Sequence, residues 1–567
     1  MITITKNKNY CHLSGDKGTL DYVRRILSEL LTIKNEEYKH VEKRYYSSLW
    51  YVKKLRSNLE NTTNKINYEK ERRKKGQINI EQYNKLIGQL REQSKNISKE
   101  VEKKQYGLDN TEKYLKYNKP EVCFYKINKE EEQDIFEIGF LRKILKCLKE
   151  KKVSYRILSS RKYPLIKKVD KTKFNRQYQY LAVEKILKKK YGIIKLPTGS
   201  GKTEIARQFI NTILSYAKQE KKRIMFVVEQ TDLLLKTKEE DFTDPKTKKY
   251  KFDEKTSIGL LGAGFADYKE QIIICTIQTL NSLYKQEPKE FTEWARTFCA
   301  YIVDECDMFT TDKRLRLLRK FDNVFWKVFL SATPFSRFKE MAKMKLIGIS
   351  GGIIYNISEE NLIEKDFLAK QEAIFIKNYC LDNNARITGK NKWQKIYEKL
   401  IEKGKSRNNL IFEIFGLLRK YNLRSLFIVE KINHGEILQK KLEIPFYSGK
   451  DNVYERKEAI ENIQSGKEPI IITTRIFRRA VNIPSLQVYV NCMGYKNDSG
   501  VLQAKGRIGR IKENINKSLY IDIMDFGNQI LENHSVERKI TLESVNIKVN
   551  EMYIKDLEKY LEKYFEK

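Results

Sequence analysis

Leu196-Pro197-Thr198-Gly199-Ser200-Gly201-Lys202-Thr203 is the stretch that decides the fold of this chain. It follows a short apolar run at 191–194 and leads into a helix-forming segment at 204–210. A strand, a glycine-containing turn and a helix start make a phosphate-binding loop, because small residues let backbone N–H groups point inward at the helix N-terminus. In such a loop Lys202 reaches the β- and γ-phosphates of a nucleotide, and the Thr203 hydroxyl holds Mg²⁺.

One position departs from the general phosphate-loop pattern. Glycine usually stands five residues before Gly201, and here that position is Leu196. The alternative is a surface turn that happens to be glycine-rich. The order strand, Gly-Lys-Thr, helix favours the phosphate loop over that alternative.

Length and charge limit the class of protein. A chain of 567 residues is long enough for three or four domains. It has 112 Lys and Arg against 74 Asp and Glu, a formal net charge of +38. Such an excess favours a polyanionic partner, nucleic acid first and an anionic membrane surface second. Compositional drift toward Lys, Asn and Ile is the plain alternative, because the excess is spread along the chain.

The cysteines and the apolar runs indicate a reducing compartment. The eight cysteines form no C-x-x-C pair and the four histidines form no cluster beside them, which argues against structural zinc and iron–sulfur clusters. No signal core follows Met1 and no run of eighteen apolar residues occurs. We expect no membrane partner, and a location in the cytoplasm of a prokaryote or a phage-infected host.

The first 165 residues predict a small α/β domain with a helical insertion. Apolar residues recur at threes and fours in two polar stretches between about residues 36 and 117, with a break near Gly76. This pattern predicts an antiparallel helical hairpin whose tip carries the basic run 72–75. The hairpin is a candidate arm for tracking a duplex or docking a protein partner, and a solvated charged helix is the plain alternative for the run.

The next segment predicts a parallel sheet. Short β-branched apolar runs at 224–228, 272–275, 301–303 and 328–330 alternate with helical stretches. The third run ends in Asp304-Glu305-Cys306-Asp307, where one carboxylate can hold Mg²⁺ and the next can orient the attacking water. Upstream of the loop, Gln179 offers both a donor and an acceptor to the edge of adenine.

These stretches resemble a family. Pro197 to Thr203, Asp304 to Asp307 and Ser331-Ala332-Thr333-Pro334 look like motifs I, II and III of superfamily 2 (DExH-type) helicases and translocases. Gln179 resembles the adenine-reading glutamine, and Cys275 to Leu280 resembles a nucleic-acid-contacting turn. The pattern is most similar to UvsW-, RecG- and XPB-like DNA helicases, which implies branch migration on DNA.

The second half of the chain resembles the rest of the family pattern. A strand at 426–429 and a segment at 470–484 precede Gln503-Ala504-Lys505-Gly506-Arg507-Ile508-Gly509-Arg510, which matches motif VI and implies arginine fingers. Both Arg507 and Arg510 are candidates. Motif V departs from its pattern at Ala480 and Asn482, with two interpretations: a change in how tightly the ATP state is coupled to strand movement, or a substrate adjustment in which Arg475, Arg478 and Arg479 strengthen phosphate contacts.

The resemblance implies two tandem RecA-like domains, at 166–370 and 371–540, after the N-terminal domain at 1–165 and before an amphipathic helical tail at 541–567. It implies ATP and Mg²⁺ as cofactors. The residues it assigns to nucleotide binding are Arg176, Gln179, Pro197, Thr198, Gly199, Ser200, Gly201, Lys202 and Thr203. Those it assigns to catalysis are Lys202, Thr203, Asp304, Glu305, Gln503, Arg507 and Arg510, with Thr203 and Asp304 on the metal. The resemblance assigns the coupling of ATP hydrolysis to movement to Ser331, Ala332 and Thr333. It assigns nucleic-acid contact to Thr276, Gln278 and Thr474.

The implied function is an ATP-dependent helicase or translocase that unwinds or remodels forked and branched DNA. An RNA helicase is one alternative, because nothing in the sequence reads a 2′-hydroxyl. The other is a motor or switch subunit of a larger defence or restriction assembly, in which the hairpin docks a protein partner.

Overall fold

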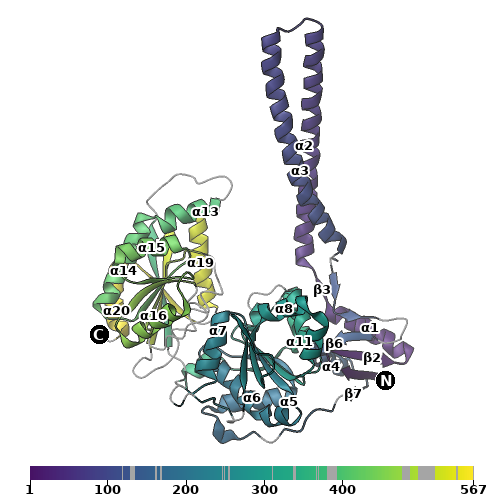
Figure 1. The fold of residues 1–567 in the computed structure, drawn as a ribbon, viewed down its shortest axis with the longest axis vertical. Coiled ribbons are helices and arrows are strands. Elements are labelled where there is room, and N and C mark those ends of the chain that lie inside the picture. The colour runs from purple at the N-terminus through teal and green to yellow at the C-terminus, as the bar shows by residue number, and fades with distance from the viewer. Residues whose placement is uncertain are drawn as a thin grey trace. The chain divides into compact units, whose positions relative to one another are not determined.

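The computed structural model describes residues 1–117, 119, 121–127, 134–159, 162–166, 169–244, 247, 249–252, 256–309, 311–335, 340–365, 367, 370–379, 392–475, 486–495, 517–544 and 547–565. The described parts form two units. One comprises residues 1–160 together with 338–348, and the other comprises 161–337 and 349–567. Figure 1 shows the fold.

The N-terminal unit contains a five-stranded sheet in the order β5-β6-β2-β1-β7. The strands are β1 (Ile2–Asn7), β2 (Tyr10–Gly15), β5 (Tyr125–Lys126), β6 (Asp134–Glu137) and β7 (Tyr155–Ser159). Strands β1 and β7 pair in parallel, and the other neighbours are antiparallel. Helices α1 (Lys17–Leu31) and α4 (Leu141–Glu150) each bury an apolar stripe, so a small core forms around alternate residues of the strands.

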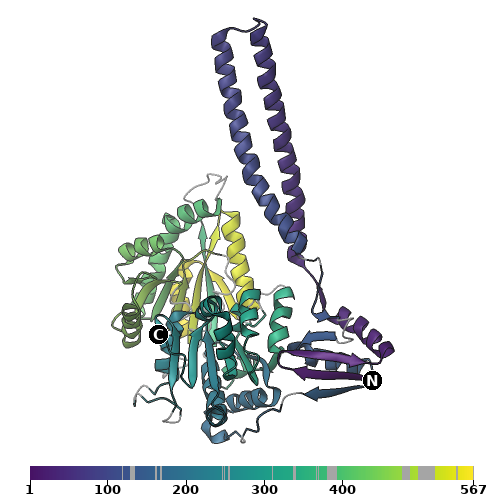
Figure 2. The ribbon, with the colours of Figure 1, turned by 45° about the vertical axis from the view of Figure 1, so that its right-hand side comes forward.

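The helical insertion starts and ends on a two-stranded ribbon. Strand β3 (Thr32–Lys34) pairs antiparallel with β4 (Glu121–Cys123). Between them lie α2 (Glu36–Lys74) and α3 (Ile80–Tyr117), which run side by side as an antiparallel hairpin in both views (Figures 1 and 2). Gly76, with φ of +70°, lies in the turn. Val52, Leu55, Ile87 and Leu108 are buried in the seam, which confirms the hairpin predicted from the narrow apolar stripes.

The first RecA-like sheet has eight strands in the order β11-β10-β12-β9-β13-β14-β8-β15. Its strands are β8 (Tyr191–Lys195), β9 (Arg223–Val228), β10 (Ile258–Gly262), β11 (Phe265–Ala266), β12 (Ile272–Thr276), β13 (Phe298–Val303), β14 (Trp326–Ser331) and β15 (Ile353–Asn356). All pairings except β10 with β11 are parallel. The parallel sheet brings the phosphate loop and the acidic motif to one edge, because the carboxyl ends of its strands align there.

Helices follow most of these strands and cover the sheet. They are α5 (Gln177–Lys189), α6 (Lys202–Gln219), α7 (Thr231–Lys236), α8 (Ile277–Gln286), α9 (Pro288–Ala295), α10 (Asp312–Leu318) and α12 (Glu359–Ile363). Residues from α5, α6 and the inward-facing positions of β9, β12 and β14 share one buried cluster. The near-continuous burial of these strands is typical of a sheet covered on both faces.

The second RecA-like sheet has seven strands, all parallel, in the order β18-β19-β17-β20-β21-β16-β22. They are β16 (Lys370–Tyr379), β17 (Ser425–Val429), β18 (Phe446–Tyr447), β19 (Ile470–Thr474), β20 (Val488–Asn491), β21 (Lys517–Phe526) and β22 (Lys548–Met552). Helices α14 (Lys405–Lys420), α15 (Ile432–Leu442) and α20 (Ile554–Phe565) share a core with one face. Helices α16 (Val453–Ser465) and α19 (Gln529–Glu543) pack on the other; a short α13 (Lys392–Ile396) precedes α14.

Two boundaries differ from those expected. Helix α11 (Glu340–Ser350) was assigned to the first RecA-like domain, but residues 338–348 group with the N-terminal unit. Gly139 explains this close packing, because a Cβ there would lie 2.0 Å from the carbonyl oxygen of Ile347. The tail at 541–567 contains the expected helix, α20, but it is part of the second RecA-like domain: β22 pairs with β16, and α20 buries Leu557 and Leu561 in the core.

Candidate functional site

The phosphate loop lies between β8 and α6, as expected. Gly199 and Gly201 have φ of +84° and +83°, a backbone region that favours glycine, and this lets the loop turn back over the start of α6. The Ser200 side chain is buried, and its hydroxyl donates to the Pro197 carbonyl at 2.7 Å. Helix α6 begins at Lys202, so its first amide groups are left for a ligand.

Leu196, the departure from the general pattern, is a core residue. Its side chain is fully buried in the same apolar cluster as α5 and α6. Its amide donates to the Ser331 carbonyl at 3.1 Å, so the loop starts beside the end of β14. The Leu196 side chain therefore fixes the start of the loop to the apolar core, and the turn at 199–201 keeps its glycines.

Lys202 is placed between the loop and the acidic motif. Its ammonium lies 3.5 Å from the Leu196 carbonyl oxygen and 3.8 Å from a Glu305 carboxylate oxygen. The side chain is only 8% exposed. Both contacts are long for charge-assisted hydrogen bonds, so a phosphate group would compete with them on favourable terms.

Asp304 and Glu305 follow β13 at the same edge of the sheet. The pKa of Asp304 is raised to about 7, mainly by burial and to a smaller extent by the neighbouring Glu305 carboxylate. Lys202 opposes this rise. Glu305 has φ of +46°, which turns its side chain away from the strand direction toward Lys202. Two carboxylates close together with one lysine nearby favour the binding of a cation.

The last acidic residue of the motif, Asp307, connects to motif III. Ser331 donates its hydroxyl to Asp307 at 3.0 Å, and both residues are buried. The Thr333 amide donates to the same Ser331 oxygen at 3.0 Å. The structure therefore brings together the acidic motif and two of the three predicted coupling residues through one hydroxyl. Ala332 is between them in the chain.

The adenine side of the site is built around α5. Gln179 is 4% exposed, and its amide nitrogen lies 2.9 Å from where a Gly201 Cβ would be, so the side chain lies on the phosphate loop. Arg176 donates to the Tyr178 hydroxyl at 2.9 Å, and Tyr178 donates to the Ser200 carbonyl. The Arg176 guanidinium also covers the Phe367 ring at 4.5 Å. Tyr178 was missed in the sequence, although a buried tyrosine needs a hydrogen-bond partner.

The predicted nucleic-acid contacts have unequal environments. Thr276 is 3% exposed, and its hydroxyl caps α8 by accepting from the Thr279 amide at 3.1 Å. Gln278 is exposed on the first turn of the same helix. Thr474 ends β19 and is 9% exposed, next to Arg475, which pairs with Glu430 and lies over the Tyr495 ring at 5.2 Å.

Motif VI lies outside the described residues. This applies to Gln503, Arg507 and Arg510, and also to Ala480 and Asn482 of motif V. The roles expected of these residues stay predictions.

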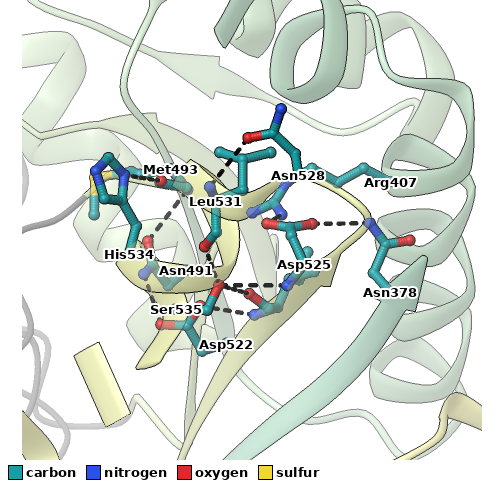
Figure 3. A network of polar contacts seen from close by, with 12 residues as sticks. Asn378, Arg407, Asn491, Met493, Asp522, Asp525, Asn528, Leu531, His534 and Ser535 are labelled. Atoms are coloured by element: carbon teal, nitrogen blue, oxygen red, sulfur yellow. Dashed lines mark hydrogen bonds and ion pairs between the residues drawn. The ribbon is translucent and has the colours of Figure 1, made fainter. Parts of the chain in front are cut away.

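A buried polar network supports the strands on either side of motif VI (Figure 3). Asp522 on β21 accepts two hydrogen bonds from Arg538 at 2.8 and 3.0 Å and one from Asn491 at 2.8 Å. Asp525 pairs with Arg407, and Asn378 donates to it at 2.8 Å. This network was not predicted from the sequence. The two carboxylates inside the apolar run 519–526 could have indicated it, because charged side chains in a buried strand need partners of opposite charge.

Arg538 also reaches the chain before motif VI. It donates to the Tyr495 carbonyl at 3.1 Å, and Tyr495 packs against Trp393 with ring centroids 5.0 Å apart. The chain just after β20 and the middle of β21 are therefore held by the same buried arginine.

Two further observations concern the described part of the chain. None of its helices combines the length and apolarity needed to cross a bilayer. In the same residues no three His, Cys, Asp or Glu side chains gather as a metal-ion site.

Comparison with known proteins agrees with this architecture. Residues 173–336 match the family model "Type III restriction enzyme, res subunit", and residues 406–512 match "Helicase conserved C-terminal domain". The DNA 3'-5' translocase XPB2 of Sulfurisphaera tokodaii is 24% identical over 417 residues, covering 67% of this chain and 87% of that protein.

Solved structures are similar at low identity. T4 UvsW is 15% identical with a TM-score of 0.38, covering 98% of this chain and 99% of that chain. Dbp5 of S. cerevisiae, bound to RNA and ADP BeF3, is 17% identical with a TM-score of 0.49, covering 69% and 93%. A matched model in each RecA-like half and a translocase among its relatives indicate an ATP-hydrolysing helicase of superfamily 2, related to XPB-like proteins.

Proposed function

We propose that this helicase is a DNA translocase that couples ATP hydrolysis to the unwinding or remodelling of forked and branched DNA. The observation that carries the proposal is the linked arrangement at one sheet edge. Lys202 lies beside Glu305, and Asp307 of the same acidic motif is hydrogen-bonded to Ser331 of motif III. A change at the γ-phosphate could therefore be transmitted from Lys202 through the acidic motif to Ser331 and the segment that follows it. The net charge of +38 and a relative named as a DNA translocase support DNA as the substrate.

Mg²⁺ fits the acidic motif. Burial and the neighbouring Glu305 carboxylate raise the pKa of Asp304, and a divalent ion would offset both effects by favouring the charged carboxylate. Asp304 and Thr203 would hold it, and a bound Mg²⁺ would supply positive charge beside the phosphates. Glu305 is then free to orient the attacking water, while Lys202 binds phosphate.

The second RecA-like domain completes the proposed cycle. Arg507 and Arg510, with Gln503, would reach the γ-phosphate when ATP closes the two domains, and hydrolysis would remove that contact. Gln278 and Thr474 would contact backbone phosphates of the bound strand. Thr276 would do so only by exchanging its bond to the Thr279 amide. Phosphate contacts carry no sequence information, so binding should be sequence-independent and salt-dependent. Such a motor would work on DNA in the cytoplasm of a prokaryote or a phage-infected cell.

Steady-state ATP hydrolysis tests the proposal. It is measured without nucleic acid and with single-stranded DNA, forked duplex DNA, a four-way junction and matched RNA, with Lys202→Ala as the inactive control. Stimulation by forked or four-way DNA above that by RNA is expected. Stimulation by RNA that equals or exceeds it would assign the protein to RNA remodelling instead.

A second candidate is a motor subunit of a restriction or defence assembly. The match of residues 173–336 to a type III restriction enzyme subunit favours it. In that case the hairpin would dock a protein partner, and ATP hydrolysis by the isolated chain would respond to none of the nucleic acids above.

A further inference from the structure

One face of helix α2 is unlike the rest of the hairpin. From Lys43 to Leu59 the chain has five basic residues and no acidic ones, together with four aromatic residues. The basic residues are Lys43, Arg44, Lys53, Lys54 and Arg56, and the aromatic residues are Tyr45, Tyr46, Trp50 and Tyr51. The hairpin as a whole, residues 36–117, has 20 Lys and Arg against 12 Asp and Glu. The segment 43–59 is therefore more positive and more aromatic than the hairpin as a whole.

Tyr46 and Trp50 point away from helix α3, whereas the Tyr51 hydroxyl donates to Glu100 of α3 at 3.1 Å. Val52 and Leu55 are buried in the seam between the helices. At about 100° per residue, Trp50 lies roughly 140–160° from these two positions around the helix, and Tyr46 lies roughly 120–180° from them. Tyr46 is 62% exposed and Trp50 is 63% exposed.

Lysines lie close to these rings. The Lys54 ammonium is 5.2 Å from the centre of the Trp50 ring. Lys43 and Lys53 are exposed at helical spacing from Tyr46 and Trp50. An aromatic ring with a lysine nearby can bind one nucleotide: the base stacks on the ring, and the lysine contacts the phosphate.

We propose that this face of α2, defined by Lys43, Tyr46, Trp50, Lys53 and Lys54, binds single-stranded nucleic acid. Unpaired bases stack on Tyr46 and Trp50, and the three lysines contact phosphates. The proposal rests on the proposed function and adds to it a binding surface on the hairpin, outside the two RecA-like domains. A strand exposed by unwinding would thereby be held by the inserted arm.

The charge pattern favours nucleic acid over a protein on this face. A second copy would bring five more positive charges against the first, and a helix docking by coiled-coil packing would need an aliphatic stripe that this face lacks. The basic run at the tip is different. There Arg72 pairs with Glu69 at 3.1 Å and Lys74 pairs with Glu71 at 2.8 Å, so acidic neighbours already compensate two of its charges.

The test uses the full-length protein and fluorescent 30-nucleotide oligo(dT), its RNA counterpart oligo(U) and a 30-base-pair DNA duplex, without ATP. The Tyr46→Ala/Trp50→Ala variant should weaken binding to both single strands at least tenfold and to the duplex much less, because stacking needs unpaired bases. The Lys43→Gln/Lys53→Gln/Lys54→Gln variant should lower the slope of log affinity against log salt by about 2 for single strands.

Tyr68→Ala is the matched control. Tyr68 is on the same helix and 64% exposed, and the Arg72 guanidinium lies 5.9 Å from its ring centre, but Arg72 pairs with Glu69, so the loss of Tyr68 should leave affinity within about twofold. Photocrosslinking of 5-bromodeoxyuridine-substituted oligonucleotide should label the tryptic peptide 45–53. ATP hydrolysis without nucleic acid should be unchanged in all three variants.

The outcomes separate this proposal from the previous one. If the wild type binds single strands and both variants bind equally well without a crosslink to 45–53, the hairpin surface is refuted while the translocase remains. If the wild type binds no nucleic acid, both proposals fall. If sedimentation shows that the wild type self-associates and Tyr46→Ala/Trp50→Ala does not, the face is a protein interface and the proposal is overturned.

Discussion

Leu196 shows how a single residue can depart from a motif without removing its chemistry. Its buried side chain supports the phosphate loop, while the glycines that the loop geometry requires are retained at 199 and 201. Sequence could predict Lys202 and the acidic motif because their chemistry is local to a few residues. It could not predict the contact between Asp307 and Ser331, since this joins residues 24 positions apart across two strands.

Leu196→Gly restores the residue that the general pattern expects, and it should damage the protein. Removing a fully buried leucine side chain leaves a cavity in the core and should lower the free energy of unfolding by about 3–5 kcal/mol. Chemical denaturation of the wild type and the variant measures this. Leu196→Met, which conserves volume, is the control and should cost less than about 1.5 kcal/mol. A neutral Leu196→Gly would show that the loop does not depend on this anchor.

The raised pKa of Asp304 predicts a pH-dependent stability. Below about pH 4 the carboxyl is protonated in both folded and unfolded chains, so it contributes equally. As pH rises from about 4 to about 7, the unfolded chain releases the proton while the folded chain holds it, and stability is lost over that window. Asp304→Asn removes this titration, so without metal or nucleotide the variant should be more stable than the wild type at pH 8 and equal to it near pH 4.

The size of the Asp304 effect follows from the shift. At about 1.4 kcal/mol per pKa unit the shift from 3.8 to about 7 corresponds to roughly 4 kcal/mol, and partial exposure of the side chain reduces the expected gain to about 2 kcal/mol. Thermal unfolding in EDTA at a series of pH values measures it. Added Mg²⁺ with nucleotide should reverse the order at pH 8, because the wild-type carboxylate then has a cation. A pH-independent difference between the two proteins would contradict the assignment.

Among the helices and strands, those with a clear apolar pattern in their own sequence were predicted. The apolar runs at 191–194, 224–228, 272–275 and 328–330 correspond to β8, β9, β12 and β14, and the two narrow stripes correspond to α2 and α3. Strand β22 was not predicted, because its sequence Lys-Val-Asn-Glu-Met is polar and it is a strand through pairing with β16. The placement of α11 was also missed, since membership of a unit depends on contacts with residues some 200 positions away.

Gly139→Ala tests the packing of α11 in the N-terminal unit. A Cβ at 139 would lie 2.0 Å from the Ile347 carbonyl oxygen and 2.3 Å from that of Gly348, so helix α11 must shift. We expect a loss of about 1–3 kcal/mol in unfolding free energy and faster hydrogen exchange across residues 340–350. Gly88→Ala in α3 is the control. Nothing lies within 4 Å of its Cβ position, so this change should stabilise by about 0.5–1 kcal/mol.

For the whole molecule, the hairpin should be separable from the fold. Its two ends meet on the β3–β4 ribbon, where Lys34 pairs with Glu121 and the Asn35 side chain donates to the Lys119 carbonyl at 3.1 Å. Replacing residues 35–120 by Asn-Gly closes this ribbon with a two-residue turn. Because the hairpin buries its apolar stripe within itself, we expect the excised protein to fold, to keep its ATP hydrolysis without nucleic acid, and to bind single strands more weakly.

A shortened hairpin distinguishes loss of the arm from loss of the Tyr46 and Trp50 face. Deleting residues 57–70 and 83–96 removes two heptads from each helix, which preserves the seam register and retains the segment 43–56. This variant should bind oligo(dT) within about threefold of the wild type, whereas the excised protein should resemble Tyr46→Ala/Trp50→Ala. Both are compared by fluorescence anisotropy at two salt concentrations. Loss of ATP hydrolysis without nucleic acid in the excised protein would mean that the hairpin is part of the folding core and not an insertion, because an arm closed at its base contributes nothing to the site at Lys202.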